Sequence, residues 1–325
     1  MKLARRHFLN LAAGTAALPG LSRIAKADTY PSRPVHLIVP QAPASSTDIH
    51  ARLIGQWLSD HLGQPFIVDD RPGAGGNVGT ELVVRATPDG YTLLTVNSQN
   101  AISPALYPDL TFDFIRDIMP IGQVSFAPLV MEVNPSVPAK TVPEFIAYAK
   151  ANPGKINMAS AGVGGPQHLA GELFKSMTGL NLIHVPYRGT TPAITDMLAG
   201  NVQLMFDVLP TSLPHIKAGK LRALAVTSKQ RLDALPDLPP VADYLPGYEA
   251  AGWLGLGAPR GTPSEIIDTL NKQVNAALAD SAIKTKLADI GVLVQGGSPS
   301  DFGKFIAEET AKWGKVIRDA GIKPD

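Results

Sequence analysis

Short apolar runs alternate with amphipathic runs along nearly the whole chain, and this alternation limits the possible fold more than any other feature. Val35–Val39 is apolar and ends at Pro40. Thr47–Leu62 then repeats apolar residues at helical spacing and stops before Gly63. Repetition of a strand followed by a helix is typical of proteins with mostly parallel sheets. We therefore predict an α/β fold.

Further strands are expected wherever a short apolar run is bounded by Gly, Pro or Asn. These runs are residues 65–69, 91–95, 127–133, 156–159, 182–185, 203–206, 222–226 and 252–258. Helices are expected between them. One begins in a capping box at Thr141–Glu144, and a long terminal helical stretch begins at Thr262–Glu265.

The length and order of these runs favour two domains. About 298 residues follow residue 27, which suits two domains better than one. One long apolar segment leads into the middle of the chain and another leads out of it. We favour an inserted domain joined by two crossing strands, with residues 28–126 and 250–325 as lobe 1 and residues 127–249 as lobe 2. Two consecutive domains with a single linker are the alternative.

The first 27 residues have the features of a bacterial export signal. Arg5 and Arg6 precede a weakly hydrophobic run to about Leu21, and small residues follow at Ala25 and Ala27. The order Arg-Arg-x-Phe-Leu resembles a twin-arginine signal, with an ordinary secretory signal as the alternative. Either signal predicts cleavage after Ala27 and a mature protein in the periplasm.

Charge and cysteine content exclude several function classes. Residues 1–27 hold five of the 29 basic side chains and none of the 28 acidic ones, so the mature chain has a net charge of −4. Such a surface does not suit nucleic acid, which requires clustered Lys and Arg. No later run reaches the length of a membrane helix. The sequence contains no cysteine, which excludes disulfides and thiolate chemistry.

Three junctions between a strand and a helix have small or hydroxylated residues: Pro40–Asp48, Ser160–His168 and Tyr187–Pro192. Helix N-termini present free N–H groups and a positive dipole end, and small side chains let a ligand approach them. These loops are candidates for anion binding, although each could also simply form a tight turn. The candidate ligand-binding residues are Ala44, Ser45, Ser46, Thr47, Asp48, Asn77, Ser160, Ala161, Gly162, Gly164, Gly165, His168, Arg188 and Asp207.

Catalytic and cofactor motifs are missing from the sequence. It has no G-x-S-x-G or H-E-x-x-H motif. The glycine-rich segment Gly73–Gly79 has Val78 where a dinucleotide fingerprint needs glycine, and no Asp or Glu ends the next strand. His168 and His184 can be paired with Asp207 on paper, but we interpret such histidines as capping or packing residues. We therefore expect no enzyme activity, no cofactor and no metal site.

Several motifs together resemble one family. They are Tyr30–Val35, Arg71–Thr80, Pro88–Leu94, Ala159–Gly162 with His168–Glu172, His184–Gly189 and Gly219–Thr227. In this order they are similar to the TctC-like, or Bug, solute-binding proteins, and the likeness covers essentially the whole mature chain. Two details depart from the family pattern. Ala42–Asp48 replaces a glycine-rich first loop, and Arg188 stands where lysine is commoner.

The resemblance implies a type II periplasmic binding fold, in which two lobes close on a small carboxylate held between the first loop and the Ser160–His168 loop. It also implies delivery of the ligand to membrane subunits of a tripartite tricarboxylate transporter, similar to TctA and TctB. We expect a monomer that captures a mono- or dicarboxylate, with aromatic acids among the candidates. The alternatives are an exported cofactor-dependent enzyme and a ligand sensor for a membrane signalling receptor.

Overall fold

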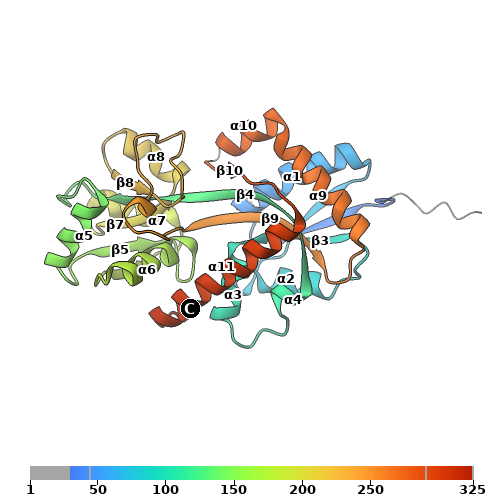
Figure 1. The fold of residues 1–325 in the computed structure, drawn as a ribbon, viewed down its shortest axis with the longest axis horizontal. Coiled ribbons are helices and arrows are strands. Elements are labelled where there is room, and N and C mark those ends of the chain that lie inside the picture. Colours follow the sequence, from blue (N-terminus) through green and yellow to red (C-terminus); the bar gives the residue numbers. More distant parts are fainter. Residues whose placement is uncertain (1–29, 44, 290, 324–325) are drawn as a thin grey trace, which may run out of the picture.

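The computed structural model describes residues 30–43, 45–289 and 291–323, so the predicted export signal and its cleavage site lie outside the described residues. Two α/β lobes are joined by the long strands β4 (Ile118–Val133) and β9 (Ala251–Pro259), which run from one lobe to the other (Figure 1). The two strands pair antiparallel along most of β9. The predicted fold class, two α/β lobes joined by two crossing strands, is confirmed.

In the first lobe, a parallel sheet is built around β1, which lies between β2 and β3, and β3 pairs antiparallel with β9. Ser45 caps α1 by accepting a hydrogen bond from the Asp48 N–H, and Gly63 ends this helix at φ 75°. The elements are β1 (Val35–Val39), α1 (Ser46–Leu62), β2 (Phe66–Asp70), η1 (Ala74–Gly76), α2 (Asn77–Val84), β3 (Thr92–Asn97), α3 (Ser98–Leu106), α4 (Phe114–Asp117), α9 (Ser264–Ala279), α10 (Ser281–Asp289) and β10 (Leu293–Val294).

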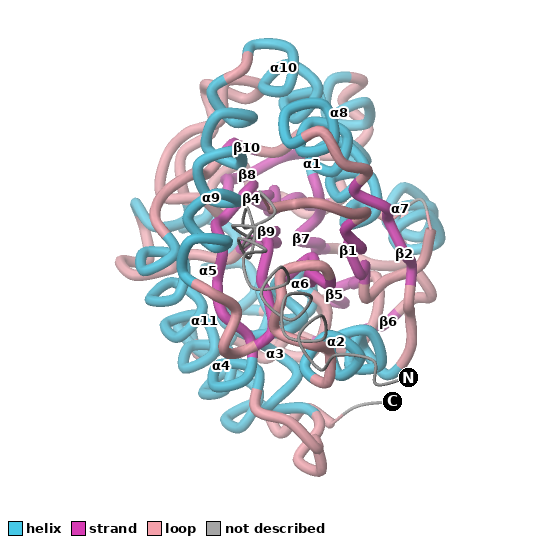
Figure 2. Tube along the Cα trace, turned by 90° about the vertical axis from the view of Figure 1, so that its right-hand side faces the viewer, coloured by secondary structure: helices cyan, strands magenta, loops and turns pink. Residues whose placement is uncertain are grey.

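In the second lobe, β5 lies between β6 and β7 in parallel pairing, and the end of β4 pairs antiparallel with β7 and β8. Viewed along the long axis, helices surround the strands of both lobes (Figure 2). The elements are α5 (Val142–Ala151), β5 (Asn157–Ser160), α6 (Pro166–Thr178), β6 (Ile183–Pro186), α7 (Thr190–Ala199), β7 (Leu204–Val208), α8 (Leu209–Lys217), β8 (Arg222–Val226) and η2 (Val241–Asp243).

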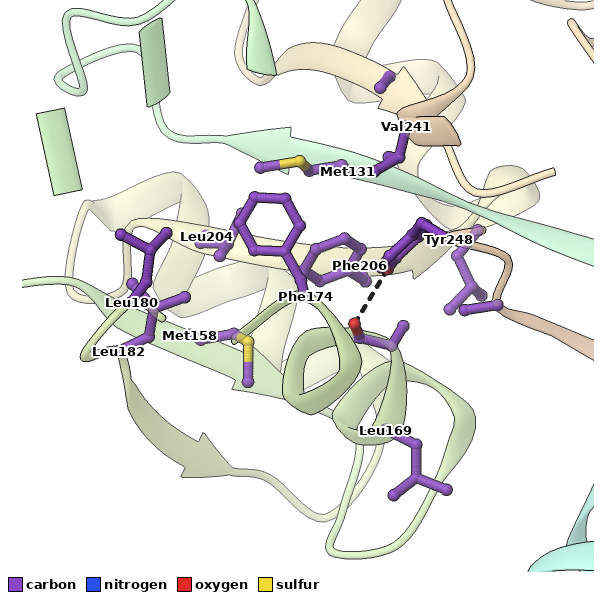
Figure 3. Packing of buried hydrophobic residues seen from close by; sticks show 14 of the residues in the cluster. Met131, Met158, Leu169, Phe174, Leu180, Leu182, Leu204, Phe206, Val241 and Tyr248 are labelled. Atoms are coloured by element: carbon purple, nitrogen blue, oxygen red, sulfur yellow. Dashed lines mark hydrogen bonds between the residues drawn. The ribbon is translucent and has the colours of Figure 1, made fainter. Parts of the chain in front are cut away.

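The core of the second lobe holds α6 against the sheet through aromatic side chains (Figure 3). The Phe174 ring of α6 lies 5.7 Å from the Phe206 ring of β7, measured between centroids. Tyr248 is fully buried beside them, and its hydroxyl donates to the Ala170 carbonyl oxygen at 2.9 Å. A buried phenol needs such a partner, because an unpaired hydroxyl is costly in an apolar core. These contacts fix the position of α6, whose first turn faces the other lobe.

Helix α11 (Pro299–Ala320) packs on both lobes. Phe302 and Ile306 belong to an apolar cluster of the first lobe, whereas Trp313, Val316 and Ile317 belong to the core of the second. The predicted division into residues 28–126 with 250–325, and 127–249, stays a prediction; α11 belongs to the first of these parts but packs on both lobes. Within the described residues, no helix combines the length and apolarity needed to cross a membrane.

Candidate functional site

A cavity of about 240 Å³ lies where the two lobes meet at the crossing strands. The first lobe contributes the loop after β1 and the start of α3, the second contributes the start of α6 and the end of β7, and β4 and β9 form the floor. Its lining residues are Gln41, Ser46, Thr47, Asn97, Ser98, Gln99, Ala127, Leu129, Pro166, Gln167, Val208, Gly252, Trp253 and Leu254.

Three helices begin at this cavity. The first residues of α1 (Ser46 and Thr47), α3 (Ser98 and Gln99) and α6 (Pro166 and Gln167) all line it, so the positive ends of three helix dipoles converge there. None of the described lining side chains carries a charge. A site of this kind favours an anion through main-chain and neutral side-chain donors rather than through an ion pair.

Among the described lining residues, Asn97 is the one with a side-chain donor that is buried and unpaired. Its Oδ1 accepts the Gln99 N–H at 2.9 Å, and Asn100 Oδ1 accepts the Asn97 N–H at 2.9 Å, which together form a capping box. The Asn97 Nδ2 group is buried and has no hydrogen-bond partner among the described residues. A buried donor without a partner is costly unless a bound molecule accepts from it. We interpret Asn97 as a ligand donor.

The predicted site residues divide between the cavity and its support. Ser46 and Thr47 line the cavity, and Ser45 caps α1 directly behind them. Sequence reasoning missed Gln41, Asn97, Ser98, Gln99 and Gln167. The available signal was the polar run of residues 97–100 directly after a predicted strand, because strand ends at a sheet edge are usual ligand positions.

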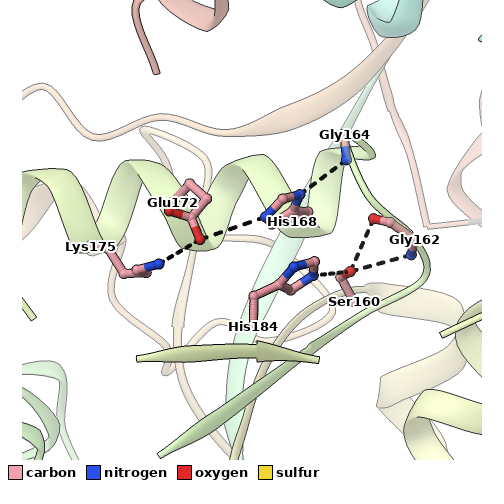
Figure 4. A network of polar contacts seen from close by, with 7 residues as sticks. All are labelled: Ser160, Gly162, Gly164, His168, Glu172, Lys175 and His184. Carbon is pink, nitrogen blue, oxygen red and sulfur yellow. Dashed lines mark hydrogen bonds and ion pairs between the residues drawn. The ribbon is translucent and has the colours of Figure 1, made fainter. Parts of the chain in front are cut away.

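The predicted loop of Ser160, Gly162, Gly164 and His168 forms a hydrogen-bonded network beside the start of α6 (Figure 4). Ser160 Oγ lies 2.6 Å from His184 Nε2, donates to the Gly162 carbonyl oxygen at 3.0 Å and accepts the Gly162 N–H at 3.3 Å. Ser160 is fully buried and does not line the cavity. The network therefore supports the loop without reaching the ligand space.

His168 holds the other end of the same loop. Its Nδ1 accepts the Gly164 N–H at 3.0 Å, so Nε2 carries the proton and faces Glu172 Oε1 at 3.6 Å. The His168 and His184 rings are stacked, with centroids 3.6 Å apart. Burial, together with the neighbouring His168, lowers the pKa of His184 to about 4. His184 is therefore uncharged at neutral pH.

Asp207 lies directly behind the cavity wall. The Gln167 amide donates to Asp207 Oδ1 at 3.3 Å, and the hydroxyls of Thr211 and Ser212 donate to Oδ2. Burial raises the pKa of the Asp207 carboxyl, and these three donors oppose that effect. Asp207 thus orients Gln167 and does not itself line the cavity.

The other predicted residues that the structure describes do not line the cavity. Asp48 is buried and paired with Arg52, whose Nε lies 2.7 Å from Oδ1. Asn77 begins α2, and Arg188 is exposed between β6 and α7. Ala161 accepts the Gly189 N–H through its carbonyl oxygen, and Gly165 precedes the first turn of α6. Ala44 lies outside the described residues.

Two larger hollows lie elsewhere. One of about 490 Å³ is on the second lobe around Arg222 and Leu235, and one of about 700 Å³ lies behind the crossing strands around Phe126 and Lys229. Neither hollow is reached by the start of a long helix. In the second hollow, Lys229 already forms a salt bridge with Glu249, and Lys312 forms one with Glu309. Among the described residues, no group of three or more His, Asp or Glu could hold a metal ion. The small uncharged cavity between the lobes is the best candidate site.

Two α/β lobes joined by crossing strands, with a cavity between them, are shared with solved structures of solute-binding proteins. The model of the tripartite tricarboxylate transporter family receptor, TctC, matches residues 50–322, and the chain belongs to this family. The resemblance seen in the sequence is therefore confirmed, and the protein is a solute-binding protein rather than an enzyme.

Relatives and solved structures agree with this assignment. Protein BugT of Bordetella pertussis is 37% identical over 310 residues, which are 94% of this chain and 95% of BugT. The structure of Rpa4515 of R. palustris with adipate is 38% identical, with a TM-score of 0.76 and coverage of 91% of this chain and 100% of that one. MatC of Rhodopseudomonas palustris with bound malate is 32% identical, with a TM-score of 0.72 and coverage of 89% and 100%.

Proposed function

We propose that this protein captures a small organic carboxylate in the periplasm by closing its lobes, and delivers it to the membrane subunits of a tripartite tricarboxylate transporter. The observation that carries the proposal is the convergence of three helix N-termini on an uncharged cavity lined by both lobes. The adipate and malate bound to Rpa4515 and MatC are carboxylates of suitable size. Residues 1–27 would direct export, with cleavage after Ala27.

The available donors are sufficient for useful affinity. A hydrogen bond to a charged group contributes roughly 1.5–3 kcal/mol. Three or four such bonds from the starts of α1, α3 and α6 therefore reach the ~8 kcal/mol that corresponds to micromolar binding. The small volume and the apolar lining residues Leu129 and Val208 favour a ligand with a short apolar body.

Calorimetric titration of the mature protein tests this function. We expect binding of one or more acids in a panel containing adipate, malate and benzoate, and no binding of adipamide, which has the shape of adipate without its charge. Failure of folded protein to bind any acid, or equal binding of adipamide, would refute carboxylate capture. Amino-terminal sequencing of the periplasmic protein should begin at Asp28, and a different first residue would refute the predicted cleavage site.

Delivery needs a separate test. Crosslinking of the liganded protein in cells that express TctA-like and TctB-like subunits should give a complex with them, and ligand-free protein should give less of it. Complex formation with a sensor kinase instead would favour the alternative of a signalling receptor.

A further inference from the structure

The stacked histidines His168 and His184 lie beside the candidate site without lining it. Each ring bonds a different end of the short glycine loop that leads into α6. His168 Nδ1 accepts the Gly164 N–H, and His184 Nε2 bonds Ser160 Oγ, which contacts both the N–H and the carbonyl of Gly162 (Figure 4). The two rings therefore hold the main chain at Gly162, through Ser160, and at Gly164, just before the helix start that lines the cavity.

This loop needs external support because of its conformation. Gly162 has φ 146° and Gly164 has φ 72°, which are backbone angles that glycine adopts readily. The loop lies between β5 and α6, so helix or strand hydrogen bonds do not hold it. Gly165, which follows, precedes the first turn of α6 and has no side chain to cap it. The two imidazoles support the loop instead, since His168 accepts the Gly164 N–H and His184 bonds Ser160 Oγ, and neither ring caps the first turn of α6.

The same loop also touches the first lobe. A Cβ atom at Gly164 would lie 2.6 Å from Leu106 Cδ1 at the end of α3, so the two lobes meet here at close range. A small displacement of Gly164 would move both the start of α6 and this contact. Loop position is therefore coupled to ligand binding and to the fit between the lobes.

We propose that His168 and His184 are a pair of positioning residues, which set ligand affinity by holding the Gly162–Gly165 loop and which do not contact the ligand. This inference rests on the proposed carboxylate binding at the same cavity. The atoms that hold the loop are Nδ1 of His168 and Nε2 of His184, because they form the hydrogen bonds to Gly164 and Ser160. The two sites should therefore respond oppositely to side-chain length.

Amide substitutions separate the two atoms. Asparagine places its Oδ1 as many bonds from Cβ as histidine Nδ1, whereas glutamine reaches the position of Nε2. His168→Asn keeps an acceptor for the Gly164 N–H, and His168→Gln does not. His184→Gln keeps a partner for Ser160 Oγ, and His184→Asn does not. All four variants lose the ring stack equally, so the Asn–Gln difference at each position isolates the hydrogen bond.

Two measurements are made on the four variants of the full mature protein. In titrations with adipate and malate, H168N and H184Q should stay within about threefold of wild type, and H168Q and H184N should bind about tenfold more weakly. In ligand-free protein, amide hydrogen exchange at Gly164 should accelerate in H168Q but not in H168N, and exchange at Gly162 should accelerate in H184N but not in H184Q.

His61 offers a matched control. Its ring also stacks on an aromatic neighbour, Trp57, at 3.8 Å, but it is exposed in the last turn of α1. H61N and H61Q should change neither the ligand affinity nor the amide hydrogen exchange at Gly162 and Gly164. Equal loss of affinity in the Asn and Gln variants at either position, or unchanged exchange at both glycines, overturns the proposal. If wild type binds no acid of the panel, the proposed function fails, and the exchange pattern alone decides whether the histidines hold the loop.

Discussion

Glu132 lies on β4 with its side chain fully buried, and neither carboxyl oxygen has a hydrogen-bond partner among the described residues. Ser212 is close by, but its hydroxyl proton is donated to Asp207. Burial and, to a lesser degree, the Asp207 carboxyl raise the pKa of Glu132 to about 8. Glu132 is therefore protonated and uncharged at neutral pH in the folded protein, whereas in the unfolded chain it is ionised.

This difference predicts a stability cost that grows with pH. The unfolded chain releases the proton above about pH 4.5, the native protein retains it up to about pH 8, and stability falls as pH rises between these values. We expect the unfolding free energy of Glu132→Gln, measured relative to wild type, to be a few kcal/mol higher at pH 8.5 than at pH 5. One pKa unit corresponds to about 1.4 kcal/mol. Urea unfolding at both pH values measures the gain. Glu308→Gln, at an exposed carboxyl, is the control, and an equal pH response in both variants would contradict the account.

Asn97 permits a nearly isosteric test of the anion site. Asn97→Asp keeps the Oδ1 acceptor for the Gln99 N–H, but it replaces the free Nδ2 donor with a negatively charged oxygen. We expect carboxylate affinity to fall at least ~100-fold, because one charge-assisted bond is lost and repulsion is added. Calorimetry measures the loss. The control is Asn181→Asp, which adds the same charge beyond the other end of α6 and should bind normally. Near-normal binding by N97D would exclude Asn97 as a ligand donor.

At the scale of elements, α11 is fastened to the crossing strand β9 through one buried carboxylate. Glu309 Oε2 accepts the indole N–H of Trp253 at 3.0 Å and that of Trp313 at 2.8 Å, and Lys312 pairs with Oε1. Glu309→Ala leaves two buried indole donors without an acceptor, so we expect a loss of about 3–5 kcal/mol in unfolding free energy. Denaturant unfolding measures it. Glu308→Ala changes an exposed neighbour and should cost under about 0.5 kcal/mol, and similar costs for both variants would refute the fastening role.

Most strands were predictable from the sequence because each combines an apolar run with a clear end signal. Val35–Val39 before Pro40 and Arg222–Val226 after Gly219 appear as predicted. Strand β4 was predicted to begin near residue 127 but begins at Ile118, because pairing with β9 keeps the segment around Pro120 extended. A proline lowers strand propensity locally, and a pairing partner more than a hundred residues away overrides that signal.

Short elements and the site could be predicted only in part. The predicted terminal helical stretch is three helices with the two-residue strand β10 between them, and β10 exists only through its pairing with β4. Helix dipoles and small loops predicted Ser46 and Thr47, which line the candidate cavity. The position of Asn97 opposite Gln167 depends on how the lobes meet, which local patterns do not encode.

At the scale of the whole molecule, the cavity is lined by both lobes, so its shape depends on the angle between them. We expect saturating adipate or malate to decrease the radius of gyration in small-angle X-ray scattering, because donors from α1, α3 and α6 must converge on one ligand. Adipamide should leave the scattering unchanged. An unchanged radius with an acid that binds in calorimetry would show that capture proceeds without lobe closure.

Trp253 supplies a built-in optical signal. Of the three tryptophans in the sequence, it alone lines the cavity, while its indole N–H is anchored to Glu309. A guest molecule bound in the cavity beside Trp253 would alter its emission without any attached dye. The protein thereby carries the basis of a reagent-free fluorescent sensor for organic acids, with sensitivity set by its own affinity.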